Sequence, residues 1–166
     1  MYKTALYPGS FDPITRGHVD IIRRSAQMYD RVLIGIFKNS GKTRAWFTDE
    51  EKMEMIEEIL QKENINAEIK IFNGLLVDFI KEEKVDVLVR GLRAVSDFEY
   101  ELQFALTNKT LARSNFETVF LSASREYLYL SSSLVKEIAQ NNGELDNFVP
   151  ENVERKLIDK VKQMNL

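Results

Sequence analysis

Short apolar runs alternate with longer amphipathic segments along almost the whole chain. The apolar runs are rich in branched side chains and are predicted to be strands; they cover residues 4–7, 31–38, 68–72, 85–89 and 118–121. In the segments between and after them, apolar residues recur every three to four positions, which is typical of helices. These helices are expected from about residue 18 onward, and over residues 48–62, 75–83, 98–112, 132–140 and 150–164.

Two helix starts carry local signals as well as periodicity. Thr48 is followed three residues later by Glu51, the spacing of a capping box, and Pro150 stands where a proline is tolerated in a first helical turn. Strands that are apolar throughout and alternate with helices predict a parallel sheet covered on both faces. The expected fold is therefore α/β, a Rossmann-like doubly wound five-stranded parallel sheet in a single domain spanning residues 1–166. Such sheets bind ligands just beyond the carboxyl ends of their strands.

Composition narrows the kinds of chemistry that are available. The 166 residues contain no cysteine and one histidine, which excludes thiolate nucleophiles, disulfides and multi-histidine metal sites. A net charge of -3 gives no support to nucleic-acid binding. No apolar run is long enough to span a bilayer, and the first residues lack the pattern of a signal peptide, so we expect a cytoplasmic protein without membrane association.

Two common phosphate-binding motifs are absent. Gly41-Lys42-Thr43 resembles the end of a P-loop, but the pattern requires glycine at the position of Ile36. No G-x-G-x-x-G sequence follows the first strand, so the dinucleotide fingerprint is also missing.

The connection after the first strand is the first candidate site. Gly9 lets a ligand approach the backbone, Ser10 offers a hydroxyl, and Gly17-His18 opens a helix whose free N–H groups favour phosphate. His18 also shares a helical face with Ile21 and Ile22, so packing in the core is an alternative role for it. The position of the whole connection after a strand favours a functional role.

Two further segments lie after predicted strands. Arg90 and Arg93 bracket Gly91 where the fourth strand is expected to end, and guanidinium groups pair bidentately with phosphate. Ser131, Ser132 and Ser133 precede a helix, where serines act as ordinary caps or as an anion cradle. Solvated arginines and simple capping are the alternatives, and the shared placement of the segments favours a common site.

Asp12 lies close to these candidate phosphate ligands. A carboxylate there suggests a metal ligand, but its place between Phe11 and Pro13 fits an Asx-type turn better. We therefore expect the turn and predict no metal ligand from the protein.

Several of these segments resemble a known protein family. The stretch YPGSFDPITRGHVDII, with its T-x-G-H element at Thr15 to His18, is similar to the nucleotidylyltransferase superfamily. RGLRAVSDFEYELQ (residues 90–103), SSSLVKE (131–137) and FVPENV (148–153) resemble, within that superfamily, the bacterial phosphopantetheine adenylyltransferase family of coenzyme A biosynthesis. The T-x-G-H element is common to the superfamily, whereas RGLRA followed by DFEYE is more discriminating.

The resemblance implies a reaction and a set of site residues. It implies transfer of the adenylyl group of ATP to 4'-phosphopantetheine, giving dephospho-coenzyme A and pyrophosphate. His18, Lys42 and Arg90 would be catalytic, with His18 stabilising charge at the α-phosphate and Lys42 and Arg90 binding the acceptor's phosphate. The implied ATP-binding residues are Ser10, Phe11, His18, Gly91, Leu92, Arg93, Glu101, Tyr127, Leu128, Tyr129, Leu130, Ser131, Ser132 and Ser133. The implied phosphopantetheine-binding residues are Ser10, Lys42, Leu76, Arg90 and Asn108.

The resemblance also implies Mg²⁺ with ATP, a homohexamer and feedback inhibition by coenzyme A. One segment departs from the family pattern, because Lys42 is followed by Thr43-Arg44-Ala45-Trp46-Phe47 where a second lysine, a proline and an apolar residue before Phe are usual. This segment is one residue longer than the family pattern, and Arg44 is a second candidate for part of the role of Lys42.

Three alternatives stay open from the residues alone. A related enzyme of the same fold would use nicotinate mononucleotide or an alcohol phosphate with CTP. A nucleotide-binding regulator without catalysis is a second alternative, and a purely structural protein is a third. The set Ser10, His18, Lys42, Arg90 and Arg93 favours an enzyme over the last two.

Overall fold

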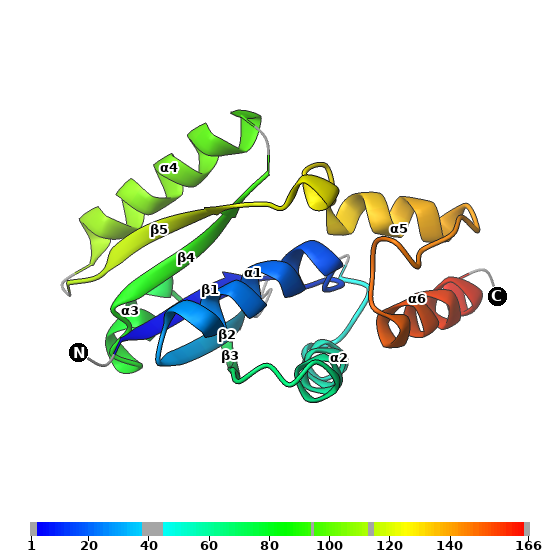
Figure 1. Ribbon diagram of the computed structural model, residues 1–166, viewed down its shortest axis with the longest axis horizontal. Helices are drawn as coiled ribbons and strands as arrows, with labels where there is room; N and C mark the ends of the chain where they lie inside the picture. Colours follow the sequence, from blue (N-terminus) through cyan, green and yellow to red (C-terminus); the bar gives the residue numbers. More distant parts are fainter. Residues whose placement is uncertain (1–2, 38–44, 94, 113–114, 165–166) are drawn as a thin grey trace.

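The protein is built around one five-stranded parallel sheet, as seen in a computed structural model that describes residues 3–37, 45–93, 95–112 and 115–164 (Figure 1). The strands are β1 (Thr4–Gly9), β2 (Arg31–Phe37), β3 (Glu68–Phe72), β4 (Val87–Leu92) and β5 (Glu117–Ser122). The helices are α1 (Arg16–Met28), α2 (Asp49–Lys62), α3 (Leu76–Glu82), α4 (Val95–Leu111), α5 (Ser132–Gln140) and α6 (Glu151–Met164), with a short 3-10 helix η1 (Arg125–Tyr127). The order β3-β2-β1-β4-β5 confirms the predicted Rossmann-like parallel sheet.

Local sequence explains where the helices begin. Helix α1 begins at Arg16, two residues before the expected start, and Thr15 caps it with a side chain that accepts the His18 N–H. The capping box of Thr48 and Glu51 opens α2 as predicted. Helix α6 begins at Glu151, immediately after Pro150.

Three strands, β1, β4 and β5, extend beyond the sequence pattern; β5 covers Glu117–Ser122 where residues 118–121 were expected. β4 begins two residues later than expected, at Val87, and α4 begins three residues earlier, at Val95. β1 was expected to end at Tyr7 but continues through Pro8 to Gly9, and β4 was expected to end at Val89 but continues to Leu92. The turn-forming residues Gly9 and Gly91 therefore lie inside strands. The predicted strand boundaries were wrong here because backbone pairing with β2 and β5 continues past them.

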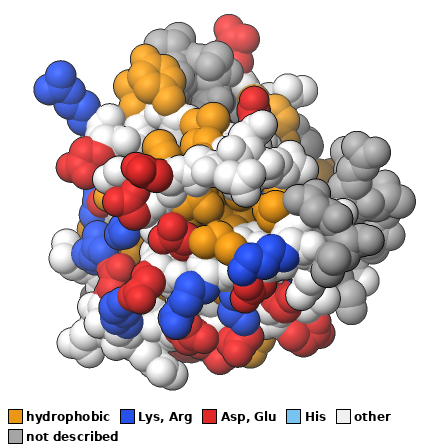
Figure 2. Space-filling model, turned by 90° about the vertical axis from the view of Figure 1, so that its right-hand side faces the viewer, with side chains coloured by type: hydrophobic (Ala, Val, Ile, Leu, Met, Phe, Trp, Pro, Cys, Tyr) orange, Lys and Arg blue, Asp and Glu red, His pale blue; other side chains and the backbone are white. Residues whose placement is uncertain are grey.

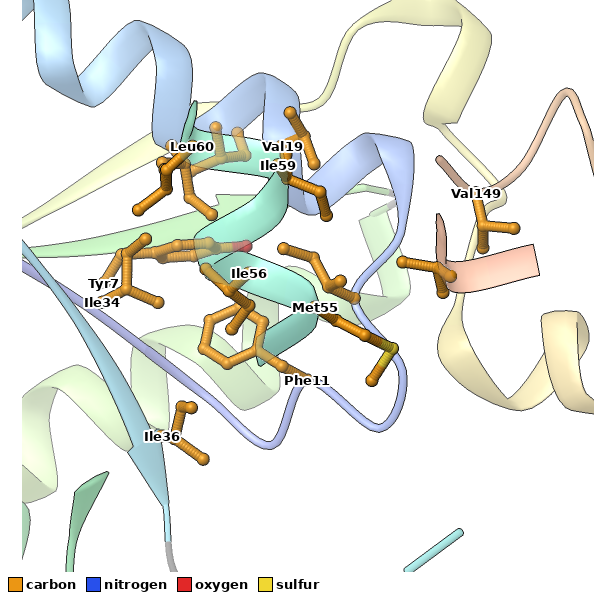
Figure 3. Packing of buried hydrophobic residues seen from close by; sticks show 14 of the residues in the cluster. Tyr7, Phe11, Val19, Ile34, Ile36, Met55, Ile56, Ile59, Leu60 and Val149 are labelled. Atoms are coloured by element: carbon orange, nitrogen blue, oxygen red, sulfur yellow. The ribbon is translucent and has the colours of Figure 1, made fainter. Parts of the chain in front are cut away.

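The core has two parts, one on each face of the sheet. The larger cluster packs α1 and α2 on one face and continues to α5 and α6 at the end of the molecule. Figure 3 shows Ile56 of α2 next to Phe11, and Ile59 of the same helix beside Val19 of α1. The smaller cluster packs α3 against the other face through Leu76, Phe79 and Ile80. Burial on both faces explains why the central strands are apolar throughout.

β1 and β4 separate partway along the sheet. Their pairing covers Ala5↔Val87 and Leu6↔Leu88, although both strands continue for several residues beyond. The strand order reverses at this pair, because the chain runs outward from β1 to β3 on one side and from β4 to β5 on the other. A doubly wound sheet binds ligands at such a point.

Helices α5 and α6 lie together at one end of the molecule, and α4 lies along the opposite margin beside β4 and β5 (Figure 1). The surface on the α5–α6 side intersperses acidic and basic side chains, without a field of one sign (Figure 2). Among the described residues, none of the helices combines the length and apolar character needed to cross a bilayer.

Candidate active site

A cavity of about 340 Å³ opens at the carboxyl ends of β1 and β4, where the two strands separate. This volume lies within the range of small-molecule binding sites. Its walls come from the end of β1, the first turn of α1, the end of β4, one residue of α4 and the β5–α5 connection. The lining residues are Tyr7, Pro8, Gly9, Ser10, Thr15, Gly17, His18, Ile21, Arg90, Gly91, Arg93, Glu101, Ala123, Tyr127, Leu130, Ser131, Ser132 and Ser133.

The structure brings most of the candidate residues together in this cavity. Those that line it are Ser10, His18, Arg90, Gly91, Arg93, Glu101, Tyr127, Leu130, Ser131, Ser132 and Ser133. They come from three segments that are distant in sequence, and the separation of β1 from β4 gives them one shared space. Lys42 and Arg44 lie outside the described residues.

The ring of His18 is held by the first turn of α1. Its Nδ1 accepts the Thr15 backbone N–H at 3.0 Å, and the Thr15 hydroxyl lies 3.0 Å from the same nitrogen. This is a capping box in which histidine takes the place that glutamate or glutamine usually occupies. Because Nδ1 accepts a backbone N–H, the neutral ring carries its proton on Nε2.

Burial, together with the nearby positive charges of Arg93 and Arg90, lowers the pKa of His18 to about 4. The imidazole is therefore neutral at pH 7. The rings of Phe11 and Tyr7 lie 5.3 and 6.4 Å from it. The alternative role in the core is thus partly correct, since His18 packs on aromatic residues and also lines the cavity.

Arg90 is paired with a carboxylate inside the cavity. Its Nε and Nη2 donate to the two oxygens of Glu101 at 2.5 and 2.7 Å, and Nη1 donates to the Pro8 carbonyl at 3.2 Å. The guanidinium carbon lies 4.7 Å from the centre of the Phe104 ring. Arg90 was expected beyond the end of β4, but it lies within the strand and is fixed against the neighbouring β1.

Arg93 and Gly17 hold the β5–α5 connection over the cavity. Arg93 Nη1 donates to the Leu130 carbonyl at 3.0 Å, which ties the end of β4 to this connection. A Cβ added to Gly17 would lie 3.3 Å from the Cβ of Tyr127, closer than nearly all such contacts. Glycine at position 17 therefore allows Tyr127 to approach the start of α1.

Some polar groups at the start of α5 are hydrogen-bonded within the protein, and others are available to bind a ligand. The Ser131 hydroxyl caps the helix by accepting the Leu134 N–H at 3.1 Å, and Ser132 donates to the Pro13 carbonyl at 2.8 Å. Within the part of the chain that the structure describes, the hydroxyls of Ser10 and Ser133 have no hydrogen bond. Helix starts also leave N–H groups without intrahelical partners, and these favour anions.

Asp12 has a different role from the local turn that the sequence indicated. Its carboxylate accepts the N–H groups of Trp46 at 3.0 Å and Phe47 at 3.0 Å, both more than thirty residues away. Lys136 donates to its second oxygen at 3.0 Å. The Asx-turn prediction was wrong because these long-range donors occupy the carboxylate.

The remaining candidate residues lie away from the cavity wall. Phe11 is buried against Gly9 and His18, whereas Tyr129 is 80% exposed. Leu76 belongs to the smaller core cluster, and the buried Asn108 donates to the Phe104 carbonyl at 2.8 Å. Leu92 and Leu128 are partly buried and do not line the cavity.

Several lining residues were not singled out from the sequence as ligand contacts. Tyr7 is buried, and this burial raises the pKa of its phenol. Thr15 belongs to the T-x-G-H element, so that motif was the available signal for it. Ile21 and Ala123 gave no local signal, because only the packing of α1 beside β4 and β5 brings them to the cavity.

Known proteins resemble this chain in both sequence and structure. The family described as cytidylyltransferase-like matches residues 6–138. A phosphopantetheine adenylyltransferase of Clostridium perfringens is 46% identical over 162 residues, covering 98% of this chain and 97% of that protein. A phosphopantetheine adenylyltransferase of Alkaliphilus metalliredigens is 51% identical over 149 residues, covering 90% and 93%.

Solved structures share the fold at low identity. A putative nicotinate-nucleotide adenylyltransferase from Vibrio parahaemolyticus superposes with a TM-score of 0.71 at 13% identity, covering 97% of this chain and 95% of that one. A nicotinic acid mononucleotide adenylyltransferase from Plasmodium falciparum gives 0.67 at 13% identity, covering 100% and 97%. At such identity the likeness concerns the fold alone.

Proposed function

The chain belongs to the cytidylyltransferase-like family and, within it, to the phosphopantetheine adenylyltransferases, and on this premise we propose that it transfers the adenylyl group of ATP to 4'-phosphopantetheine. The products are dephospho-coenzyme A and pyrophosphate. One observation in the structure carries the proposal. The cavity between β1 and β4 combines a neutral histidine donor, two arginines and the start of a helix, which are groups suited to phosphates.

The proposed reaction does not need a general base. A phosphate oxygen of the acceptor attacks the α-phosphorus of ATP, a new P–O bond forms, and the bond to pyrophosphate breaks. The attacking oxygen is already anionic near neutral pH. Catalysis then rests on positioning and on donors directed at the developing charge.

Each part of the cavity has a role in this step. The Nε2–H of His18 donates to the α-phosphate as charge develops there, and it is oriented by the bond from Thr15 to Nδ1. The first turn of α5 and the Ser10 hydroxyl bind the triphosphate. Arg90 receives the phosphate of the acceptor, which must compete with Glu101 for the guanidinium. Lys42, outside the described residues, is assigned to the acceptor phosphate as well.

The other assignments from the family complete the site. The remaining nucleotide contacts are assigned to Phe11, Gly91, Leu92, Arg93, Glu101 and residues 127–133. Leu76 and Asn108 are assigned to the pantetheine arm, and both are nearly buried at 4% and 8% exposure. Side-chain movement there would accompany acceptor binding.

Mg²⁺ fits this residue set as a companion of ATP. The described residues contain no group of three or more histidine or carboxylate side chains placed to hold a metal. Mg²⁺ retains much of its water and is commonly held by substrate phosphates. When bound with ATP it neutralises phosphate charge.

We also propose a cytoplasmic homohexamer inhibited by coenzyme A. The outer side of α4 exposes Tyr100 and Leu106 at 65% and 59%, which is apolar surface suited to contacts between copies. Coenzyme A contains both the adenylyl and the pantetheine parts of the product, so we assign it to the same cavity. Size-exclusion chromatography with light scattering measures the assembly.

The deciding experiment measures pyrophosphate release from ATP and Mg²⁺ with and without 4'-phosphopantetheine. We expect acceptor-dependent release and a product with the mass of dephospho-coenzyme A. His18→Ala should keep the fold and lose about 10²-fold or more in kcat, because one preorganised donor is removed. Parallel reactions with nicotinate mononucleotide, and with CTP and an alcohol phosphate, test the related activities. Release with one of these and not with 4'-phosphopantetheine would overturn the proposal.

A further inference from the structure

The carboxylate of Asp12 joins three segments that are far apart in sequence. It lies in the β1–α1 connection and is 7% exposed. Its Oδ1 accepts the N–H groups of Trp46 and Phe47, both at 3.0 Å. Its Oδ2 accepts Lys136 Nζ of α5 at 3.0 Å and lies 3.2 Å from the Trp46 nitrogen. Oδ1 therefore binds backbone N–H groups alone, whereas Oδ2 binds both the Trp46 N–H and the Lys136 ammonium.

Lys136 is held on a second side as well. Its ammonium lies 5.8 Å from the centre of the Trp46 ring, and its side chain is 22% exposed. Because both side chains are mostly buried, solvent and salt screen the attraction between Lys136 and Asp12 only weakly. Lys136 is fixed by Asp12 and by the residue that Asp12 itself fixes.

The same two segments meet a second time, one helical turn earlier. Ser132, the first residue of α5, donates to the Pro13 carbonyl at 2.8 Å. The paired contacts Asp12–Lys136 and Pro13–Ser132 set both the position and the rotation of α5 relative to the β1–α1 connection. They thereby set the distance between the start of α5 and Ser10 and His18 across the cavity.

Asp12 is not itself a wall of the cavity. Its oxygens accept two backbone N–H groups, one of them shared between both oxygens, and one ammonium, and this occupancy argues against direct contact with substrate or metal. The residue has no reacting group within the site, so any effect on the reaction must pass through α5.

We infer that Asp12 is a positioning residue of the adenylyl-transfer site, which acts through Lys136 to hold the first turn of α5 where the triphosphate binds. The role of Asp12 in adenylyl transfer rests on the proposed function. Its expected effect on ATP binding rests on the geometry alone. Asp12 and Lys136 would then form a second layer behind the cavity wall. Both residues lie outside the T-x-G-H element and outside the serine run of residues 131–133.

Asp12→Asn and Lys136→Met test this inference selectively. Asparagine keeps an oxygen for the N–H groups of Trp46 and Phe47 and replaces the oxygen that faces Lys136. Methionine keeps an apolar stem against Trp46 and removes the ammonium. Each variant should raise the KM for ATP about tenfold, as expected when one charge-assisted hydrogen bond is lost, and should change kcat less than about threefold.

The double variant Asp12→Asn/Lys136→Met should resemble either single variant, since both remove one shared contact. Lys156→Met is the matched control, because Lys156 also pairs with a carboxylate of another helix, Glu54, away from the cavity. It should leave the KM for ATP unchanged. An unchanged KM in the Asp12 and Lys136 variants, or additive effects in the double variant, would overturn the inference.

Two further readouts separate this inference from the proposed function and from simple destabilisation. Calorimetric titration with ATP should show the same tenfold loss of affinity even if wild-type protein does not use 4'-phosphopantetheine. A lower melting temperature with wild-type ATP affinity would show a merely structural role and contradict the inference. If Asp12→Asn does not fold, Lys136→Met decides alone.

Discussion

Arg90 and Glu101 form a two-bonded ion pair inside the cavity, with Nε–Oε2 at 2.5 Å and Nη2–Oε1 at 2.7 Å. Both side chains are mostly buried, at 17% and 12% exposure. The arginine assigned to the acceptor's phosphate is thus already paired with an anion. Binding of a phosphate at Arg90 requires the guanidinium to share its donors or exchange partners.

This pairing predicts that removing the Glu101 charge strengthens anion binding. Glu101→Gln should bind 4'-phosphopantetheine about fivefold more tightly than wild type, because the cavity gains net positive charge and the carboxylate that competes for Arg90 is lost. Isothermal titration with 4'-phosphopantetheine in the absence of ATP is the measurement, since this ligand carries the phosphate assigned to Arg90. Glu117→Gln, which removes an exposed partner of Lys109, is the control. Equal or weaker binding by Glu101→Gln would show that the carboxylate only orients Arg90.

The histidine predicts a pH-dependent spectroscopic signal. His18 is the only histidine of the sequence, so its ring resonances are unambiguous. We expect ¹⁵N spectra to show the Nε2–H tautomer and a midpoint near 4, the value that burial and the two arginines give. A midpoint near 6.5 would contradict the enclosed environment of the ring.

The same shift predicts how stability depends on pH. The unfolded chain binds a proton at His18 below about 6.5, whereas the folded chain binds it only below about 4. The stabilisation is complete above pH 6.5 and is lost as the pH falls from 6.5 toward 4, by about 3 kcal/mol at most. Urea unfolding at pH 7 and 4.5 measures this, with His18→Gln as the non-titrating control. The wild type should lose more stability than this variant over that interval.

Phe11 predicts a large effect on stability. Its ring is 1% exposed, packs edge-on to Tyr7 at 5.7 Å, and lies under Gly9. Its backbone has a φ of +45°, which costs free energy in a residue with a side chain. Phe11→Ala should therefore lower the free energy of unfolding by about 3–5 kcal/mol through the cavity it leaves, measured by chemical denaturation. Met28→Ala, at a side chain 55% exposed, should change it by less than about 1 kcal/mol.

Gly17 predicts an effect on ATP that is separate from stability. An alanine there places its Cβ 3.3 Å from Tyr127, so the β5–α5 connection must move outward by a few tenths of an ångström. Gly17→Ala should raise the KM for ATP severalfold without loss of stability, because alanine favours helix by up to about 1 kcal/mol. Steady-state kinetics and thermal melts test both halves. Gly17→Val should raise the KM further, and an unchanged KM in both variants would refute the role of this contact.

The fold was predictable because its signals are local. Apolar runs and helical periodicity located every strand and every α-helix of the described chain, and the capping box placed α2 to the residue. The errors were in boundaries, and the most informative fell at Gly9 and Gly91, where turn-forming residues lie within paired strands. Pairing with a neighbouring strand overrode the local preference at both positions.

The site was predictable in part, and for a different reason. Strand ends meet at one edge of a parallel sheet, so Ser10, His18, Arg90 and Ser132 were expected to converge, and they share one cavity. Their partners were not predictable, because spacing along the chain does not specify which carboxylate reaches Arg90 or which N–H groups reach Asp12. The 3-10 turn η1 also lacked a periodic signal, since three residues are too few to show one.

The contacts between the β1–α1 connection and the last third of the chain also bear on protein synthesis. Ser132 and Pro13 are 119 positions apart, Lys136 and Asp12 are 124 apart, and Arg16 bonds to the Asp146 carbonyl across 130. A ribosome adds about 5–20 residues per second, so on the order of ten seconds separate the two sides of this junction. During that interval the nascent chain contains β1 and His18 but not the β5–α5 connection and α5, which form the opposite wall of the cavity. The growing polypeptide therefore completes the cavity between β1 and β4 only after α5 has been synthesised.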